Sequence, residues 1–248
     1  MVSHDAVAFY LLSQAVVKTR KVVQCGQGAD EVFAGYSWYQ PLDGVGGPGD
    51  PIYAQEFFDR PHQELEEVLE PAMRAEPDPS RAFVAREFAR PGAEEAVDRA
   101  LRLDTEIMLV DDPVKRVDNM TMAWGLEART PFLDHDLVEL AAACPPSLKL
   151  AGGGKGVLKE AARTVVPAEV IDRPKGYFPV PALSHLEGGA LAAVTEALQS
   201  QAARDRGVFR REYVDRLLAA PNDHQTTLEG SKLWQIGLLE LWLQAQGV

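Results

Sequence analysis

The sequence predicts a mostly α-helical part of an α/β domain, with one or a few parallel strands, and three observations lead to this fold class. A short β-branched segment, 21–25, is followed by a glycine-rich turn and a helical segment that ends near Gly35, the order of elements at the binding edge of α/β folds. Helical periodicity covers nearly all of the remaining chain. No second segment predicts a strand of comparable quality, and a parallel strand needs a partner. We therefore expect the partner strands in an N-terminal half that this chain does not contain.

The expected elements follow from the spacing of apolar residues and from capping residues. Asp5 is a typical N-cap, and apolar residues recur at helical spacing over 6–18. Segment 21–25 has the unbroken β-branched character of a buried parallel strand, and the glycine- and proline-rich segment 41–51 predicts a loop. No linker divides the chain, so one domain is expected over 1–248. Further helices are expected at 62–73, 80–89, 94–110, 116–128, 136–144, 155–165, 190–198, 211–218 and 228–246.

Composition excludes several classes of protein. The 248 residues include 25 basic and 37 acidic side chains, a net charge of −12, which argues against a nucleic-acid-binding domain. No apolar run approaches the roughly 18 residues of a membrane span. The two cysteines, Cys25 and Cys144, lack metal-ligand spacing and indicate reduced thiols. We expect a cytoplasmic protein with no nucleic-acid or membrane partner.

The turn after the predicted strand carries the first candidate site, the sequence G-Q-G-A-D-E at 26–31. Glycines let backbone N–H groups approach a phosphate, and a following helix N-terminus favours negative charge. The adjacent carboxylates of Asp30 and Glu31 would repel phosphate unless Mg²⁺ lay between them. Mg²⁺ typically binds one or two carboxylates together with phosphate oxygens. The structural alternative is an ordinary helix start in which both carboxylates interact with the helix dipole.

A second candidate site lies in the segment 116–134. Of its four charged candidates, Arg116, Asp118 and Glu127 lie within the predicted helix 116–128, and Arg129 lies in the turn after it. The residues alone favour the structural alternative, a helix whose apolar side chains enter the core and whose charges form ion pairs.

Two further segments combine cations with turn residues. Lys155 stands among the glycines of 152–156, a candidate flexible phosphate loop that does not have P-loop spacing. Such a lysine could bring a mobile charge to a departing phosphate. Arg173 and Lys175 precede aromatic residues in a proline-containing segment and are candidates for contacts with an anionic ligand. The alternatives are a turn with a solvated lysine and a surface loop held by the aromatic residues.

Taken in order, the four segments resemble one family. The motifs are G-x-G-A-D-E, K-R-x-D-x-x-x-M-A-x-G-x-E-x-R-x-P-F-L-D, G-K-x-x-L-K-E-A and R-x-K-x-x-F. Together they are similar to the asparagine-synthetase superfamily of glutamine-dependent amide ligases over nearly the whole chain. Within it, segments 2–10, 26–28, 173–181 and 230–234 resemble the branch of N-acetylglutaminylglutamine amidotransferases, which make a dipeptide amide.

The resemblance implies the C-terminal part of a synthetase domain with the adenine nucleotide alpha-hydrolase-like fold. The implied chemistry is adenylation of a small-molecule carboxylate with ATP and Mg²⁺, followed by amide formation with ammonia from glutamine. The resemblance implies catalytic roles for Lys155, Glu127 and Arg129, and a magnesium contact by Asp30. The residues for which it implies cofactor contacts are Gly26, Gln27, Gly28, Asp30, Glu31, Arg116, Asp118, Arg173 and Lys175.

The chain departs from the family pattern in three ways. It has no S-G-G-x-D-S pyrophosphate loop and no cysteine directly after Met1, and Gln27 stands where asparagine synthetases carry Glu. We therefore expect that the missing N-terminal half is a partner, or that the chain self-associates. The expected product is a glutaminylglutamine-type dipeptide amide, otherwise asparagine. The alternatives are a truncated, inactive remnant or partner-dependent subunit, and a sister ligase similar to a β-lactam synthetase.

Overall fold

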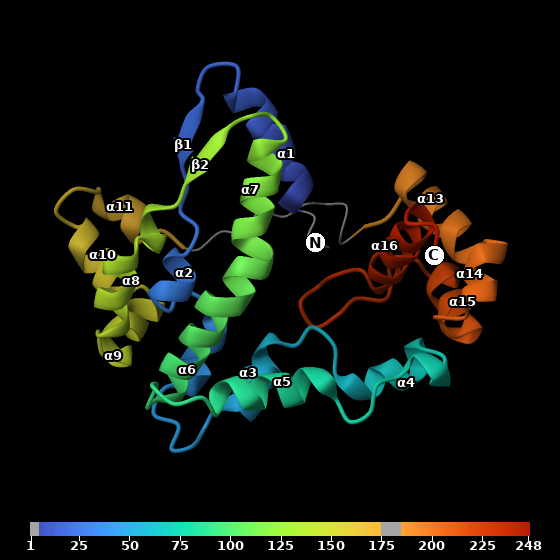
Figure 1. Cartoon of the computed structure of the whole chain (residues 1–248), viewed down its shortest axis with the longest axis horizontal. Coiled ribbons are helices and arrows are strands. Elements are labelled where there is room, and N and C mark those ends of the chain that lie inside the picture. The colour runs from blue at the N-terminus through green and yellow to red at the C-terminus, as the bar shows by residue number, and fades with distance from the viewer. Residues whose placement is uncertain (1–4, 175–184) are drawn as a thin grey trace. The chain divides into compact units, whose positions relative to one another are not determined.

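The computed structural model describes residues 5–174 and 185–248 (Figure 1). These residues form two compact units, each built from two separate stretches of chain. The first, called the strand unit, comprises 5–57 and 80–174 of the described residues, and the second, called the helical unit, comprises 58–79 and 185–248. Within the described ranges, no helix is long and apolar enough to cross a membrane.

The strand unit contains a two-stranded parallel sheet, β1 (Val22–Gln24) beside β2 (Glu127–Arg129) (Figure 1). The middle residues, Val23 and Ala128, lie opposite each other. The prediction that the first strand has no partner in this chain is therefore wrong. The prediction that this strand is buried is also wrong, since Val22 is 53% exposed.

A glycine ends the helix before the second strand, earlier than the periodicity of the sequence predicts. The pattern predicts a helix over 116–128, but α7 (Lys115–Met122) ends earlier. Gly125 has a φ of 64°, a left-handed conformation that glycine adopts without steric cost. Leu126 N donates to the Thr121 carbonyl at 3.1 Å. This bond closes the helix end, and the chain continues as a strand.

α1 (Asp5–Val16) packs against α7 (Figure 1). Arg116 links the two helices, because its guanidinium lies 3.4 Å from the Asp5 carboxylate and 5.9 Å from the centre of the Phe9 ring. The helix predicted at 6–18 is confirmed with shifted ends.

Short helices make up the rest of the strand unit. They are α2 (Ala29–Val32), α3 (Asp50–Phe57), α5 (Pro79–Phe88), α6 (Ala96–Leu103), α8 (His135–Ala142), α9 (Pro146–Leu150), α10 (Gly156–Ala162) and α11 (Ala168–Ile171), with 3-10 helices Ser37–Leu42, Pro131–Leu133 and Ala151–Gly153. Two π-helical segments, Asp104–Met108 and Val110–Val114, follow α6. The helices predicted at 80–89, 136–144 and 155–165 are confirmed with shifted ends, whereas the one at 94–110 is an α-helix only in its first half.

An apolar cluster holds α2 against α8. Its buried members include Val32 and Phe33 at the end of α2 and Ala141 of α8, and Leu133 and Leu158 pack against them. Because Leu158 belongs to α10, the same cluster fixes the helix that follows the glycine-rich loop. Two segments distant in sequence are thereby held in one place.

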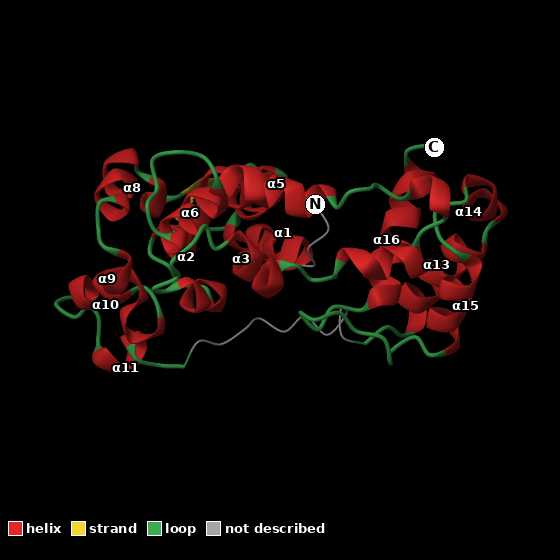
Figure 2. Cartoon of the chain, turned by 90° about the horizontal axis from the view of Figure 1, so that it is seen from below, coloured by secondary structure: helices red, strands yellow, loops and turns green. Residues whose placement is uncertain are grey.

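The helical unit contains α13 (Gly188–Gln199), α14 (Gln201–Arg206), α15 (Arg211–Ala219) and α16 (Lys232–Ala245), which Figure 2 labels. It also contains α4 (Leu65–Val68) and the 3-10 helices His62–Glu64 and Pro71–Met73. α13 and α16 approach closely, since a Cβ on Gly237 would lie 2.3 Å from Val194 Cγ1. The helices predicted at 190–198 and 211–218 are confirmed.

Two predicted helices of this unit differ from the structure, one in its interior and one at its start. The helix predicted at 62–73 is interrupted at Leu69, whose backbone is extended. The helix predicted at 228–246 begins only after Ser231, whose Oγ accepts a hydrogen bond from Trp234 N at 3.2 Å. This is an N-cap, which satisfies a backbone donor that a helix leaves without a partner.

Candidate active site

The turn between β1 and α2 has a shape that requires glycine. Gly28 has a φ of 93°, and a Cβ there would lie 2.3 Å from Leu133 Cδ2. Its carbonyl accepts a hydrogen bond from Val32 N at 2.9 Å. Gly26 is exposed, and no heavy atom lies within 4 Å of where its Cβ would be. The turn thus presents open backbone at the carboxyl end of a parallel strand, where α/β folds bind ligands.

Asp30 and Lys155 meet in the structure although they are far apart in the chain. Lys155 Nζ donates to Asp30 Oδ1 at 2.9 Å. The backbone N–H of Lys155 also donates, at 3.0 Å, to the carbonyl of Phe33 directly after α2. The side chains are 24% exposed for Asp30 and 27% for Lys155. The structure therefore brings two predicted site residues together at an accessible place.

The loop that carries Lys155 is docked through its backbone. Gly154 has a φ of 105°, and a Cβ there would lie 2.4 Å from the Ala34 carbonyl oxygen. Lys155 itself has a φ of 57°, a conformation that costs a residue with a Cβ about 1–2 kcal/mol. Lys159 Nζ donates to the Gly152 carbonyl at 2.8 Å. The predicted flexible loop, and its alternative of a solvated lysine, are wrong, because the backbone is docked and the amine is paired.

Glu31 lies in different surroundings from its neighbour Asp30. It is buried, and the Tyr36 hydroxyl donates to its Oε1 at 2.7 Å. Burial, with the Glu31 charge as the second cause, raises the pKa of the Tyr36 phenol well above its usual range, so the phenol remains a donor. Of the two adjacent carboxylates, only Asp30 has the exposure that a contact with a bound metal or phosphate needs.

A buried carboxylate, Asp104, lies in the same unit and accepts hydrogen bonds from three aromatic side chains. Trp38 Nε1 donates to Oδ2 at 3.0 Å, Tyr39 donates to the same oxygen at 2.5 Å, and Tyr53 donates to Oδ1. Burial raises the pKa of Asp104 to about 6, and the Glu31 charge contributes in the same direction, while the three hydrogen bonds oppose the rise.

The sequence contains a signal for Asp104 that the motif analysis does not use. Buried residues of α6 follow helical spacing at Val97, Ala100 and Leu101. Asp104 continues the same face, four positions after Ala100 and three after Leu101. A carboxylate on an otherwise apolar helix face indicates a buried acid with dedicated partners.

Glu127 and Arg129 lie on β2 and form an ion pair at 3.1 Å, with half or more of each side chain exposed. Cys25 N donates to the Arg129 carbonyl at 2.9 Å, so β2 ends beside the start of the Gly26 turn. These two predicted residues therefore lie at the same sheet edge as the turn. An exposed ion pair of this kind contributes little to stability.

The remaining predicted site residues do not lie beside the Asp30–Lys155 pair. Arg116 is buried, and its guanidinium lies 3.0 Å from the Asp112 carboxylate in addition to its contacts with α1. Asp118 and Arg173 are exposed. Lys175 lies outside the described residues. The structure thus gives Arg116 a role in helix packing, and the four charged residues predicted as a candidate site in 116–134 do not gather in one place.

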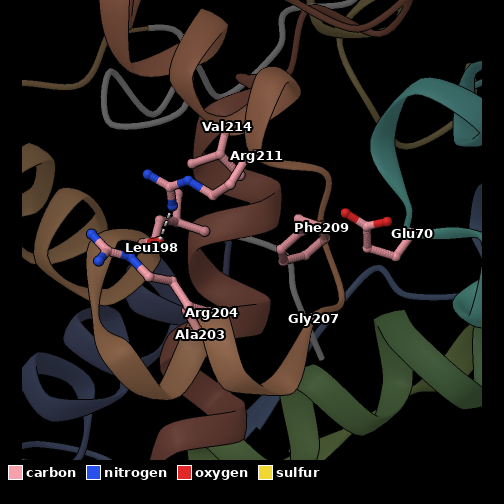
Figure 3. A pocket seen from close by; sticks show the side chains of 8 residues that line it. All are labelled: Glu70, Leu198, Ala203, Arg204, Gly207, Phe209, Arg211 and Val214. Atoms are coloured by element: carbon pink, nitrogen blue, oxygen red, sulfur yellow. Dashed lines mark hydrogen bonds between the residues drawn. The ribbon is translucent and has the colours of Figure 1, made fainter.

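A small pocket of about 110 Å³ is lined by residues of the helical unit. Figure 3 shows the guanidinium groups of Arg204 and Arg211 on one side and the Glu70 carboxylate on the other. Arg211 is already bonded, donating to the Leu198 carbonyl at 3.1 Å and to Asp215 at 2.9 Å. None of the predicted site residues lines this pocket.

The donor set at Asp30 fits one kind of metal site. Among residues 5–174 and 185–248, no group of three or more His, Cys, Asp or Glu side chains is placed to hold a metal ion. Mg²⁺ in nucleotide sites needs only one or two carboxylates, because phosphate oxygens and water complete the shell. Asp30, accessible beside open turn backbone, fits Mg²⁺ that arrives with a nucleotide, and Glu31 does not.

The fold and the site define a helix-rich α/β protein with an acid–lysine pair at the end of a strand–turn–helix unit. The sequence model of the family described as asparagine synthase matches residues 1–244. The chain belongs to the asparagine synthase family, which confirms the resemblance at the level of the superfamily.

Individual relatives agree with this assignment. The chain is similar to a putative asparagine synthetase (glutamine-hydrolyzing) of Mycobacterium tuberculosis, with 27% identity over 95% of this chain and 41% of the relative. It is similar to asparagine synthetase (glutamine-hydrolyzing) 1 of Bacillus subtilis, with 24% identity over 96% of this chain and 42% of the relative. The human asparagine synthetase (glutamine-hydrolyzing) is 37% identical over 36% of this chain and 16% of its own length. The chain thus spans about two-fifths of the length of the two bacterial relatives.

Proposed function

We propose that the chain is the C-terminal part of the synthetase domain of an ATP-dependent amide ligase that uses glutamine as its nitrogen donor. The Asp30–Lys155 pair, 2.9 Å apart at the carboxyl end of β1, is the observation that carries the proposal. It joins an accessible carboxylate to a compact cation beside open turn backbone. The names of the relatives, which are glutamine-hydrolyzing asparagine synthetases, support the same reaction class.

In the proposed reaction, a substrate carboxylate oxygen attacks the α-phosphorus of ATP, and the bond to the pyrophosphate oxygen breaks. Ammonia then attacks the acyl carbon of the adenylate, AMP leaves, and the nitrogen loses a proton. The Lys155 ammonium neutralises the charge that develops on the departing pyrophosphate, and the backbone around Gly26 and Gly28 gives phosphate room to approach. Glu127 and Arg129, at the same sheet edge, orient the substrate.

Mg²⁺ bound with the nucleotide would supply further neutralisation of phosphate charge. Asp30 is the residue that would hold it. Asp30 would then have two partners in the loaded site, the metal and Lys155. Its pairing with Lys155 at 2.9 Å holds the carboxylate in position.

Gln27 bears on the substrate. A carboxamide cannot accept a proton as a general base, whereas the Glu of asparagine synthetases can. This favours a product other than asparagine, and we propose a glutaminylglutamine-type dipeptide amide, with asparagine as the alternative. A sister ligase that forms an internal amide, as β-lactam synthetases do, is a second candidate on the same residues.

The surface of the strand unit supports a partner. α1 exposes Val7 (62%) and Leu11 (56%) on one side, and each strand of the sheet has one unpaired edge within the described part of the chain. Exposed apolar patches and open strand edges are typical of surfaces that associate. We propose that an N-terminal half carrying the S-G-G-x-D-S loop covers this surface, and that second copies of the chain do so in its absence.

The test is AMP release by the chain joined to such an N-terminal half, with ATP, ammonia or glutamine, and glutaminylglutamine or aspartate as acceptor. Lys155→Ala should lower kcat by about 10²-fold or more with a smaller effect on KM for ATP, the scale of removing one transition-state contact. Lys155→Arg should not restore the rate, because a planar guanidinium does not replace a compact ammonium. Lys115→Ala, which removes an exposed lysine of α7, is the matched control.

Three results would contradict the proposal in different ways. No AMP in the complete assembly would indicate an inactive remnant. Amide formation that needs no ammonia would indicate the internal-amide ligase. Normal turnover of Lys155→Ala would remove Lys155 from the chemistry.

A further inference from the structure

A cluster of buried and half-buried aromatic side chains links Asp104 to α2. Asp104 is fully buried, and its two carboxylate oxygens accept three side-chain hydrogen bonds. Two donors, Trp38 and Tyr39, come from the 3-10 helix Ser37–Leu42, and the third, Tyr53, comes from α3. Asp104 therefore ties three segments of the strand unit together.

A buried carboxylate that connects three segments contributes less to folding stability than a well-packed apolar side chain would. What the buried carboxylate provides is geometry, because each hydrogen bond to it fixes the position and orientation of one aromatic ring. Asp104 is also the first residue of the π-helical segment Asp104–Met108. Single π-turns inside helices occur frequently at functional sites, where they change the direction of a side chain.

The fixed rings lead toward the acidic helix. Trp38, held by Asp104, stacks on Tyr36 with ring centres 4.1 Å apart and an angle of 14°. The Tyr36 hydroxyl in turn donates to Glu31 at 2.7 Å. Glu31 lies in the four-residue helix α2 directly after Asp30, so its position determines where the Asp30 carboxylate points.

We propose that Tyr36 is a positioning residue that holds α2 in the orientation in which Asp30 contacts Lys155. The chain of contacts runs from Asp104 through the Trp38 and Tyr36 rings to Glu31. The functional meaning of this orientation rests on the proposed amide-ligase function. The orientation itself is a property of this chain and is measurable without activity.

The experiment measures the reactivity of the Lys155 amine. The full chain is treated with a limiting amount of acetic anhydride, and acetylation of each lysine is quantified by mass spectrometry, with Lys159 as the internal standard. An amine held in an ion pair reacts slowly. Tyr36→Phe keeps the stacked ring and removes only the hydroxyl, and it should raise the relative acetylation rate of Lys155 by about 3- to 10-fold, as expected for loss of one hydrogen bond.

Two further variants separate positioning from general loosening. Tyr213→Phe removes a bonded phenol hydroxyl in the helical unit, where Arg60 donates to it at 2.9 Å, and should leave the Lys155 rate unchanged. Asp104→Asn retains the shape of the side chain, one strong acceptor and a donor for Tyr53, and should keep the Lys155 rate within about twofold of the wild type. Melting temperatures of all three variants are measured in parallel.

An unchanged Lys155 rate in Tyr36→Phe, or an equal rise in Tyr213→Phe, would overturn the proposal. A rise confined to Tyr36→Phe supports it even if no ATP-dependent chemistry is found in any assembly. Failure of the ligase function and failure of the positioning role are therefore separate results. In an active assembly, Tyr36→Phe should lower kcat more than it changes KM for ATP.

Discussion

Asp30 and Glu31 are adjacent in the chain but differ in surroundings because successive residues of a helix point about 100° apart. One side chain reaches Lys155 at partly exposed surface, and the other is buried against the Tyr36 hydroxyl. Of the two carboxylates at this helix start, Asp30 is therefore accessible to a ligand, and Glu31 holds the helix in place. The division explains how a site of few residues is kept in place.

At this scale, sequence reasoning finds the accessible Asp30–Lys155 pair and misses the buried groups around it. Asp30 and Lys155 are predicted because glycine-rich turns mark them. Tyr36 and Asp104 carry no motif, and their hydrogen bonds join residues that only the fold brings together. Arg116 is predicted as a site residue because of its charge, although helix packing accounts for its position.

We expect Asp104 to give folding stability a characteristic pH dependence. Its pKa rises from 3.8 to about 6 on folding, so the folded state binds more protons than the unfolded state between these values. The contribution of this group is favourable below pH 3.8 and is lost as the pH rises through 6. Relative to Asp104→Asn, the wild type should lose about 2 kcal/mol of unfolding free energy between pH 4.5 and pH 7.5.

The measurement is urea unfolding of both proteins at pH 4.5 and pH 7.5. Asp118→Asn, at an exposed position of α7, controls for the change in net charge. If the difference in unfolding free energy between the wild type and Asp104→Asn is the same at both pH values, the pKa of Asp104 is not raised on folding.

Gly154 provides a second prediction at the residue scale. Gly154→Ala would place a methyl group 2.4 Å from the Ala34 carbonyl oxygen at a φ of 105°. Gly153→Ala has a φ of 77° and nothing within 4 Å, so it isolates the backbone strain of about 1–2 kcal/mol. Gly154→Ala should destabilise the protein by at least about 1 kcal/mol more, because overlap must also be relieved. Equal unfolding free energies for the two variants would refute the close approach.

At the scale of elements, periodicity predicts the longer helices well and short segments poorly. The strand Glu127–Arg129 has three residues, and its neighbours have helical spacing. Its extended form follows from the left-handed Gly125 and from pairing with β1, which is distant in sequence. The local sequence indicates the effect of Gly125, but it does not indicate the pairing with β1. The same limit applies to the π-helical segments, because their start at Asp104 coincides with tertiary hydrogen bonds.

The contact between α13 and α16 gives a prediction for elements. Gly237→Ala would place a methyl group 2.3 Å from Val194 Cγ1 and should destabilise the protein by about 1–3 kcal/mol through overpacking. Gly189→Ala, in the first turn of α13 with nothing within 4 Å, should be neutral or stabilise by up to about 1 kcal/mol. Thermal unfolding of both variants measures the difference, and a stable Gly237→Ala would show that the helices are farther apart than described.

At the scale of the whole molecule, the two units alternate along the chain. The helical unit takes its residues from 58–79 and 185–248, on both sides of the second stretch of the strand unit. Prolines and glycines near these crossings are too few and too scattered to form a recognisable linker: Pro77 and Pro79 precede the second crossing, and Pro174, Gly176, Pro179 and Pro181 lie around the third. A single domain over 1–248 is what the sequence predicts, and the division into units depends on long-range contacts that composition does not contain.

The exposed side of α1 leads to a prediction about association. Val7, Tyr10 and Leu11 lie on one side of the helix and are 62%, 39% and 56% exposed. A net charge of −12 opposes association of copies, but burial of each large apolar side chain contributes about 1.5–3 kcal/mol. We expect the isolated chain to self-associate in sedimentation velocity at micromolar concentrations.

Leu11→Glu should weaken this self-association by about tenfold or more, because it replaces a central apolar contact with a charge that must be desolvated. Val165→Glu is the matched control, since Val165 is 82% exposed outside the helices and the substitution changes the net charge by the same amount. Adding an N-terminal half that covers α1 should abolish self-association of the wild type, and Leu11→Glu should weaken binding of that half. A wild-type chain that remains monomeric at all concentrations, or equal effects of the two substitutions, would show that the α1 surface is not an interface.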